Sequence, residues 1–130
     1  GLDKRWLEPY GIDPDTAFVA LIPYSGQVVT HFERRRELGL PDTQPLVDDM
    51  APLSYVRPDC RPMLILSGDR EREMLGRYEE NAYFWRMMRV AGHPDVRICE
   101  FDGFDHGNMP QAGHFVAVRY IREMERRMDR

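Results

Sequence analysis

Short apolar runs alternate with longer segments of helical periodicity along the chain, and this pattern predicts strands separated by helices. Residues 63–68 read MLILSG, which is apolar on both faces, as expected of a strand that helices cover from both sides. A second short apolar run at residues 18–22 and a charged, strand-like segment at residues 95–102 also predict strands, since turn-forming residues bound each of them.

Helices are expected between and around these runs. Apolar residues recur at helical spacing over residues 70–91 and again near the C-terminus. The side chains that form the two expected apolar stripes are Met74, Tyr78, Ala82, Trp85 and Met88 in the first helix, and Ala117, Ile121, Met124 and Met128 in the second. A short polar helix is predicted over residues 28–39, and residues 2–9 resemble the end of a further helix.

This order of elements predicts an α/β fold in three layers. Strands separated by long helices pair in parallel through right-handed crossovers, so we expect three parallel strands with helices on both faces. A chain of 130 residues fits one domain, residues 1–130.

Composition narrows the possible functions. The net charge is −4 and no basic stripe carries interleaved aromatic residues, which argues against a nucleic-acid partner. No apolar run approaches the roughly 18 residues of a membrane span. The two cysteines have no metal-like spacing, and the D-x-x-D-H run of Asp102, Asp105 and His106 matches no established ligand geometry, so we assign no metal and no cofactor.

Two polar side chains are expected at the carboxyl edge of the sheet, where active residues of such folds gather. Asp69 follows the run at residues 63–68, and His106 follows the last strand between Gly103 and Gly107. An acid that orients a histidine is half of a nucleophilic triad. Two alternatives stay open: Asp69 as a helix cap, and His106 as a structural loop residue.

The chain resembles the C-terminal half of an α/β-hydrolase of the esterase/lipase type. The resemblance is carried by Pro62 to Asp69, which match a P-x-L-x-x-x-G-D pattern, by the helical segment at residues 76–93, and by the H-G pair at residues 106–107. It implies that Asp69 is the triad acid, that His106 is the base, and that residues 28–50 form a short cap or lid. The order of acid before histidine agrees with that family.

The resemblance also implies a nucleophile that no serine of this chain matches. The family carries its serine on a G-x-S-x-G turn, whereas Ser25 lacks the first glycine, Ser54 lies in a loop and Ser67 lies in a strand. We therefore expect the chain to be a partial, truncated α/β-hydrolase domain with its nucleophile upstream. Its first strand would then have an exposed edge that self-associates or binds an N-terminal fragment.

We therefore hypothesise that the chain is the C-terminal portion of a serine hydrolase that acts on carboxylic esters. In that reading this chain supplies Asp69 and His106, and the substrate is a small ester. The alternative is a non-catalytic truncated α/β domain that binds a partner or is an inactive remnant.

Overall fold

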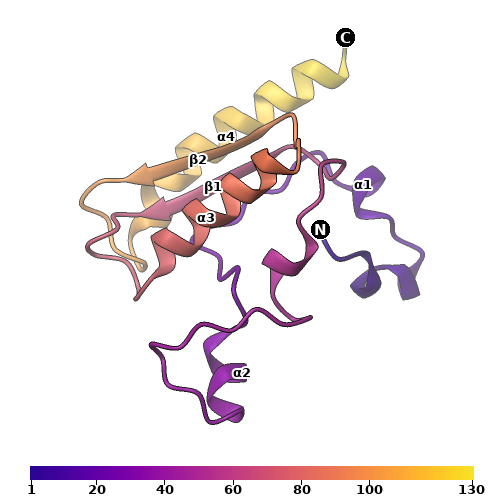
Figure 1. Cartoon of the computed structure of the whole chain (residues 1–130). Coiled ribbons are helices and arrows are strands. Elements are labelled where there is room, and N and C mark those ends of the chain that lie inside the picture. The colour runs from indigo at the N-terminus through magenta and orange to yellow at the C-terminus, as the bar shows by residue number, and fades with distance from the viewer.

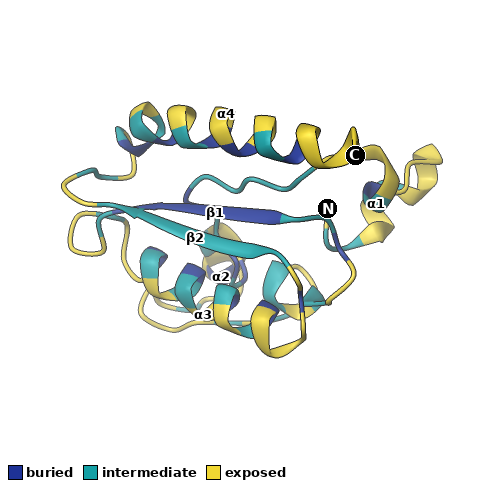
Figure 2. Ribbon diagram, turned by 90° about the horizontal axis from the view of Figure 1, so that it is seen from above, coloured by how far each residue is buried: buried dark blue, intermediate teal, exposed yellow.

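A computed structural model describes residues 1–130 and shows a small sheet with helices on both faces (Figures 1 and 2). Strands β1 (Met63–Gly68) and β2 (Val96–Phe101) pair in parallel, with Met63 opposite Val96 and Gly68 opposite Phe101. Helix α3 (Arg77–Val90) connects them and covers one face, while α4 (Met109–Met128) covers the other. The crossover through α3 is what makes parallel pairing possible.

The prediction of a third strand at residues 18–22 is wrong, because no regular strand forms there. Only two isolated parallel bridges form beside β1, joining Leu21 to Met63 and Tyr24 to Leu66. Pro23 explains the interruption, because it has no N–H to donate to the carbonyl of Leu64, and proline is tolerated only at the margins of sheets. We call residues 20–24 the edge segment, since it lies beside β1 without completing a ladder.

The remaining elements are short. They are the 3₁₀ helices η1 (Lys4–Trp6), η2 (Glu8–Tyr10) and η3 (Pro52–Tyr55), and the α-helices α1 (Pro14–Ala17) and α2 (Phe32–Glu37). The helix end expected over residues 2–9 is therefore two 3₁₀ turns; Pro9 lies at the start of the second, and left-handed Gly11 ends it. None of the helices combines the length and the apolar character that crossing a membrane requires.

The core lies on both faces of β1, all six residues of which are buried. On one face Phe84 and Met88 of α3 pack on Met63 and Ile65, and on the other face α4 packs on Leu64 and Leu66. The expected α3 stripe is largely wrong, since its buried residues are Arg77, Asn81, Phe84 and Met88. In α4, Ala117 and Met124 are buried as expected, but Ile121 and Met128 are exposed.

Helix α4 approaches the edge segment very closely at one point. A Cβ atom on Gly113 would lie 2.7 Å from a ring carbon of Tyr24, nearer than real side-chain contacts allow. The Tyr24 hydroxyl also lies 3.2 Å from Nδ1 of His114, one helical position further on. Glycine at position 113 thus lets α4 pack against the ring that precedes Ser25.

The segment at residues 28–50, expected to form a cap, contains α2 and projects from the body of the fold (Figure 1). The buried Arg35 side chain holds it together, because its guanidinium donates to the backbone carbonyls of Thr30, Asp42 and Gln44. Thr30 and Asp48 hydrogen-bond across the base of the segment. Whether this segment covers a substrate stays a prediction.

Candidate active site at the carboxyl edge of the sheet

The loops that follow β1 and β2 meet at the carboxyl edge of the sheet, and Asp69 joins them. Its backbone N–H donates to the carbonyl of Phe104 at 2.8 Å, and its carboxylate accepts from the N–H of Gly103 at 2.7 Å. The same carboxylate accepts from the N–H of Glu71. These hydrogen bonds from Gly103 and Glu71 hold the pKa of Asp69 below its ordinary value.

The close approach of the two loops depends on Gly68 at the end of β1. A Cβ atom there would lie 2.6 Å from the Phe104 carbonyl oxygen and 3.1 Å from the Glu73 side chain. A larger residue would force the loops apart. The loop that carries His106 is therefore anchored on the loop that carries Asp69 and Glu73.

The carboxylate that contacts His106 is Glu73. Its Oε2 lies 3.1 Å from Nδ1 of His106, and the Glu73 side chain has no exposed surface, whereas the His106 side chain is 45% exposed. The hydrogen bonds of the Asp69 carboxylate go to backbone groups, and His106 is not among its partners. The structure thus brings Glu73 and His106 together and directs Asp69 to the loop backbone.

Ser25 completes a cluster of three side chains. It follows the edge segment, is 2% exposed, and places its Oγ 2.5 Å from Oε1 of Glu73 and 3.0 Å from Nδ1 of His106. A carboxylate can only accept hydrogen bonds, so the Ser25 hydroxyl donates to Glu73. For the same reason Nδ1 of His106 donates to Glu73 and carries the ring proton.

Opposing influences set the charge of Glu73. Burial acts to raise the pKa of its carboxyl, but hydrogen bonds from Ser25 and from the N–H groups of Met74 and Gly68 outweigh burial. The positive charge that His106 can carry lowers the pKa further, so it stays below its ordinary value. Glu73 is therefore a carboxylate near neutral pH although it is enclosed.

The two nitrogens of His106 have different surroundings. Both Ser25 and Glu73 lie on the Nδ1 side of the ring, and no hydrogen bond within the chain involves Nε2. An imidazole with a proton on Nδ1 has a lone pair on Nε2, which can accept a proton from another group. Chemically, the cluster is an oriented general base with one nitrogen available.

The start of α4 orients the histidine loop. Oδ1 of Asp105 accepts from the N–H groups of Gly107 and Asn108, and the side chain of Asn108 accepts from the N–H of Asp105. These bonds satisfy backbone donors ahead of the helix, the usual work of residues at helix starts. No group of three histidine, cysteine or acidic side chains is arranged to hold a metal ion.

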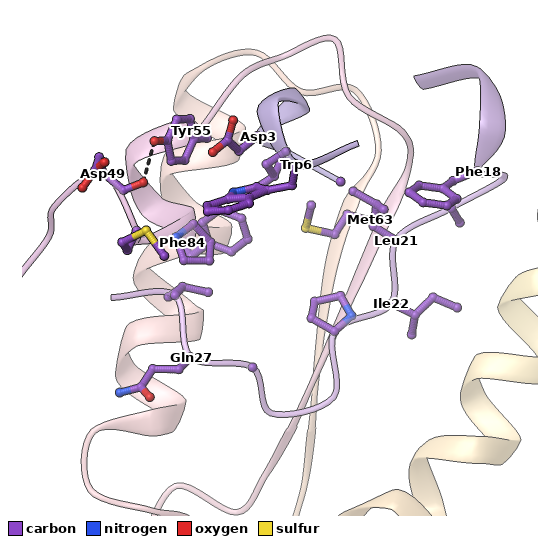
Figure 3. A pocket seen from close by; sticks show the side chains of 18 residues that line it. Asp3, Trp6, Phe18, Leu21, Ile22, Gln27, Asp49, Tyr55, Met63 and Phe84 are labelled. Carbon is purple, nitrogen blue, oxygen red and sulfur yellow. Dashed lines mark hydrogen bonds between the residues drawn. The ribbon is translucent and has the colours of Figure 1, made fainter. Parts of the chain in front are cut away.

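A largely apolar cavity of about 590 Å³ lies beside the edge segment (Figure 3). Trp6, Leu21, Met63 and Phe84 contribute to its walls, and it extends to Gly26 and Gln27, directly after Ser25. Its volume is within the range of small-molecule sites. Ser25, Glu73 and His106 do not line it.

No protein-family model matches this sequence, and no curated protein matches it. Solved structures of Est2, an esterase of the Planctomycetes species Thermogutta terrifontis, do match. The propionate-bound form is 20% identical with a TM-score of 0.59, over 81% of this chain and 42% of that chain. The form phosphoramylated by tabun is 22% identical with a TM-score of 0.61, over 81% and 41%. The form phosphorylated by paraoxon is 22% identical with a TM-score of 0.58, over 81% and 40%.

The fold is esterase-like. The chain spans about two-fifths of the length of the esterase that it matches. The α/β arrangement inferred from the sequence is thus supported, with two strands in place of three.

Sequence reasoning assigned Glu73 to a solvated helix position and set Ser25 aside as a nucleophile. Glu73 stands in a run of charged residues, R-E-R-E, that reads as the solvated start of a helix. The helix in fact begins later, at Arg77, and this leaves Glu73 in a loop that turns inward. Ser25 was rejected as a nucleophile because it lacks the first glycine of the G-x-S-x-G pattern. That pattern says nothing about other roles that a serine can have.

Proposed function

We propose that this chain supplies the acid and the base of a serine ester hydrolase, with Glu73 as the acid and His106 as the base. The observation that carries the proposal is the contact between Oε2 of Glu73 and Nδ1 of His106, with Nε2 left available. The esterase-like fold supports the reaction class, because the pair stands at the carboxyl edge of the strands. The substrate class is a carboxylic ester.

The mechanism assigns one role to each group. A serine hydroxyl from outside this chain attacks the ester carbonyl while its proton passes to Nε2 of His106. Glu73 stabilises the imidazolium through Nδ1–H, and Nε2–H then gives its proton to the departing alcohol. Water, activated by the same nitrogen, hydrolyses the acyl-enzyme and returns His106 to its starting state.

The acid role moves from Asp69, where the sequence placed it, to Glu73. Glu73 is buried and touches the ring, and these are the two properties that the acid of such a triad requires. Asp69 keeps a different role in this proposal, because its carboxylate ties Gly103 to the loop after β1. It is thereby a support for the loop that holds His106.

The nucleophile is proposed to arrive on a polypeptide that pairs with the edge segment. Backbone groups of Leu21, Pro23 and Ser25 bond to the β1 side. Those of Ile22 and Tyr24, which point the other way, have no partner within the chain. Unpaired strand edges recruit further strands. The apolar cavity beside the segment would receive side chains from one face of that strand.

The first test is to read the source gene upstream of the codon for Gly1. A G-x-S-x-G sequence in the same reading frame supports the hydrolase. A start codon immediately before the codon for Gly1 supports the alternative of a non-catalytic domain, whose open edge serves only to bind a partner.

Where that serine is encoded, the whole reading frame is expressed and assayed with p-nitrophenyl butyrate. We expect His106→Ala and Glu73→Gln each to lower kcat by two or more orders of magnitude, which is the usual contribution of acid–base groups. Asp69→Asn is the matched control and is expected to keep most of the activity. An inactive Asp69→Asn beside an active Glu73→Gln would restore Asp69 as the acid.

Sedimentation of the isolated chain tests the open edge. We expect association that increases with concentration, since one side of the edge segment is unpaired. Ile22→Pro, which removes one unpaired N–H, should weaken this association, whereas Phe115→Ser removes an exposed apolar side chain on α4 and should not. A chain that stays monomeric at high concentration contradicts this part of the proposal.

A further inference from the structure

We propose that Ser25 is a positioning residue that holds the Glu73 carboxylate against Nδ1 of His106 and is not itself a nucleophile. The inference rests on the proposed role of the Glu73–His106 pair. It adds a third residue to that site and assigns it a different task from the one that a serine beside a histidine first suggests.

The hydrogen-bonding capacity of a hydroxyl fits this position. Its single proton goes to Oε1 of Glu73 at 2.5 Å, and its lone pairs face Nδ1–H of His106 at 3.0 Å. The proton on Nδ1 is therefore shared between Ser25 and Glu73, whose Oε2 lies at 3.1 Å. Together with the N–H groups of Gly68 and Met74, the hydroxyl thus fixes the rotation of the carboxylate, and it helps to keep the ring proton on Nδ1.

The same geometry argues against Ser25 as the attacking group. In a triad the nucleophile and the acid bond to opposite nitrogens of the ring, so that the proton moves across Nε2. Ser25 and Glu73 instead share Nδ1, and the proton of the serine is already engaged by the carboxylate. Ser25 is also only 2% exposed, so a substrate in solvent has little access to its hydroxyl.

The backbone at Ser25 is held in an unfavourable conformation. Its φ is +45°, the only positive value at a residue other than glycine. Such a conformation costs roughly 1 kcal/mol or more and persists only where the surroundings enforce it. Strain of this kind is concentrated at functional sites, which supports a role for the side chain that it orients.

Hydrogen bonds to helix α3 and strand β1 hold the backbone of Ser25 in this conformation. Arg77 donates to the carbonyl of Ser25 at 2.5 Å, and Asn81, one turn later, donates to the carbonyl of Gly26 at 2.8 Å. The N–H of Ser25 donates to Leu66 of β1 at 2.7 Å. Both helix residues are buried, so three hydrogen bonds fix the turn from the sheet and from the helix.

The test uses the isolated chain and needs no activity. Histidine is labelled with ¹⁵N, and the ring nitrogens of His106 are observed by NMR at a pH where the ring is neutral, with His106→Ala giving the assignment. We expect the proton on Nδ1 in the unchanged chain and a mixture of both tautomers in Ser25→Ala. Ser25→Gly should give the same mixture, and it tolerates the positive φ, so it remains informative if the alanine variant folds poorly.

Ser67→Ala is the matched control. Ser67 is also buried at this end of the sheet, but its hydroxyl bonds only to the carbonyl of Gly68, so its loss should leave the tautomer of His106 unchanged. An unchanged tautomer in both Ser25 variants would overturn the proposal. So would an adduct on Ser25 after treatment with paraoxon, detected by peptide mass spectrometry.

In the complete protein, Ser25→Ala is expected to lower kcat about tenfold with KM little changed, which is about 1.4 kcal/mol of barrier. The two proposals fail separately. A complete protein without esterase activity contradicts the hydrolase but leaves the tautomer result standing. A normal tautomer in the Ser25 variants contradicts the positioning role but leaves the hydrolase standing.

Discussion

The start and the middle of the loop after β1 carry carboxylates four positions apart, and the two behave differently. Asp69 lies at the start and accepts hydrogen bonds from the backbone of Glu71 and Gly103. Glu73 lies further on, is enclosed, and accepts from Ser25 and His106 as well as from backbone. Both have lowered pKa values, yet only one touches a group that can exchange a proton. What surrounds a carboxylate decides its role, and its distance from the strand end does not.

The largest expected effect comes from deleting the enclosed carboxylate. Glu73→Ala leaves the Ser25 hydroxyl and the N–H of Gly68 without their acceptor inside the fold, and also removes the acceptor of the exposed Met74 N–H. Each orphaned donor costs free energy, and a total loss of roughly 3 kcal/mol in unfolding free energy is expected. Urea denaturation of the two chains measures it, and a loss no greater than that of Asp69→Ala would refute the contrast.

The pH dependence of stability sharpens the same contrast. Because the pKa of Glu73 is lower in the folded chain than its ordinary 4.5, the carboxylate adds stability above pH 4.5. That contribution is lost as the pH falls from 4.5 through the folded pKa. Glu73→Gln cannot titrate, so its unfolding free energy should fall less steeply over this range, as measured by denaturation at a series of pH values. Parallel curves would contradict the assignment.

Asp69→Ala should have a smaller and local effect. The N–H of Gly103 loses its acceptor and faces solvent, so its hydrogen exchange should accelerate by tenfold or more, while amides in the middle of β1 and β2 keep their protection. Amide exchange followed by NMR gives this reading residue by residue. Faster exchange throughout the sheet would mean that Asp69 supports more than the histidine loop.

The smallest effect is expected at Arg70, between the two carboxylates. Its guanidinium pairs with Glu100 of β2 but is half exposed, so solvent screens the pair. Arg70→Gln should change the denaturation midpoint only slightly, and 0.5 M salt should reduce the difference between the two chains. A large, salt-independent loss would show that packing of Arg70 on the Tyr78 ring dominates instead.

The sequence specified the central elements well. β1 lies where a continuous apolar run predicted it, because a strand buried on both faces has little freedom in composition. β2, which includes Arg97 and Glu100 and is only partly buried, lies where a charged segment between turn-forming residues predicted a strand. The histidine loop at the end of β2 was also located from its glycines. The edge segment was mispredicted because apolar content outweighed Pro23, whose missing N–H breaks the pairing beside β1.

The proposed acid, Glu73, could not be identified from sequence spacing. Helical periodicity extended α3 back to Arg70, which placed Glu73 on a solvated surface, whereas the loop is stabilised by the N–H groups of Arg72 and Glu73 bonding to the carbonyl of Asp69. The role of Ser25 could not be predicted from the sequence either. Its left-handed backbone conformation is held by hydrogen bonds with Arg77 and Leu66, which are distant in the sequence. Long-range contacts determine both positions.

The close contact between α4 and the edge segment has a consequence for how relatives of this chain can vary. With the Tyr24 ring 2.7 Å from where a Cβ would stand on Gly113, a larger residue at one position requires a smaller one at the other. Positions 24 and 113 should therefore change together over evolutionary time although they are 89 positions apart in the sequence. The pair is a signature by which diverged sequences of this kind could be recognised.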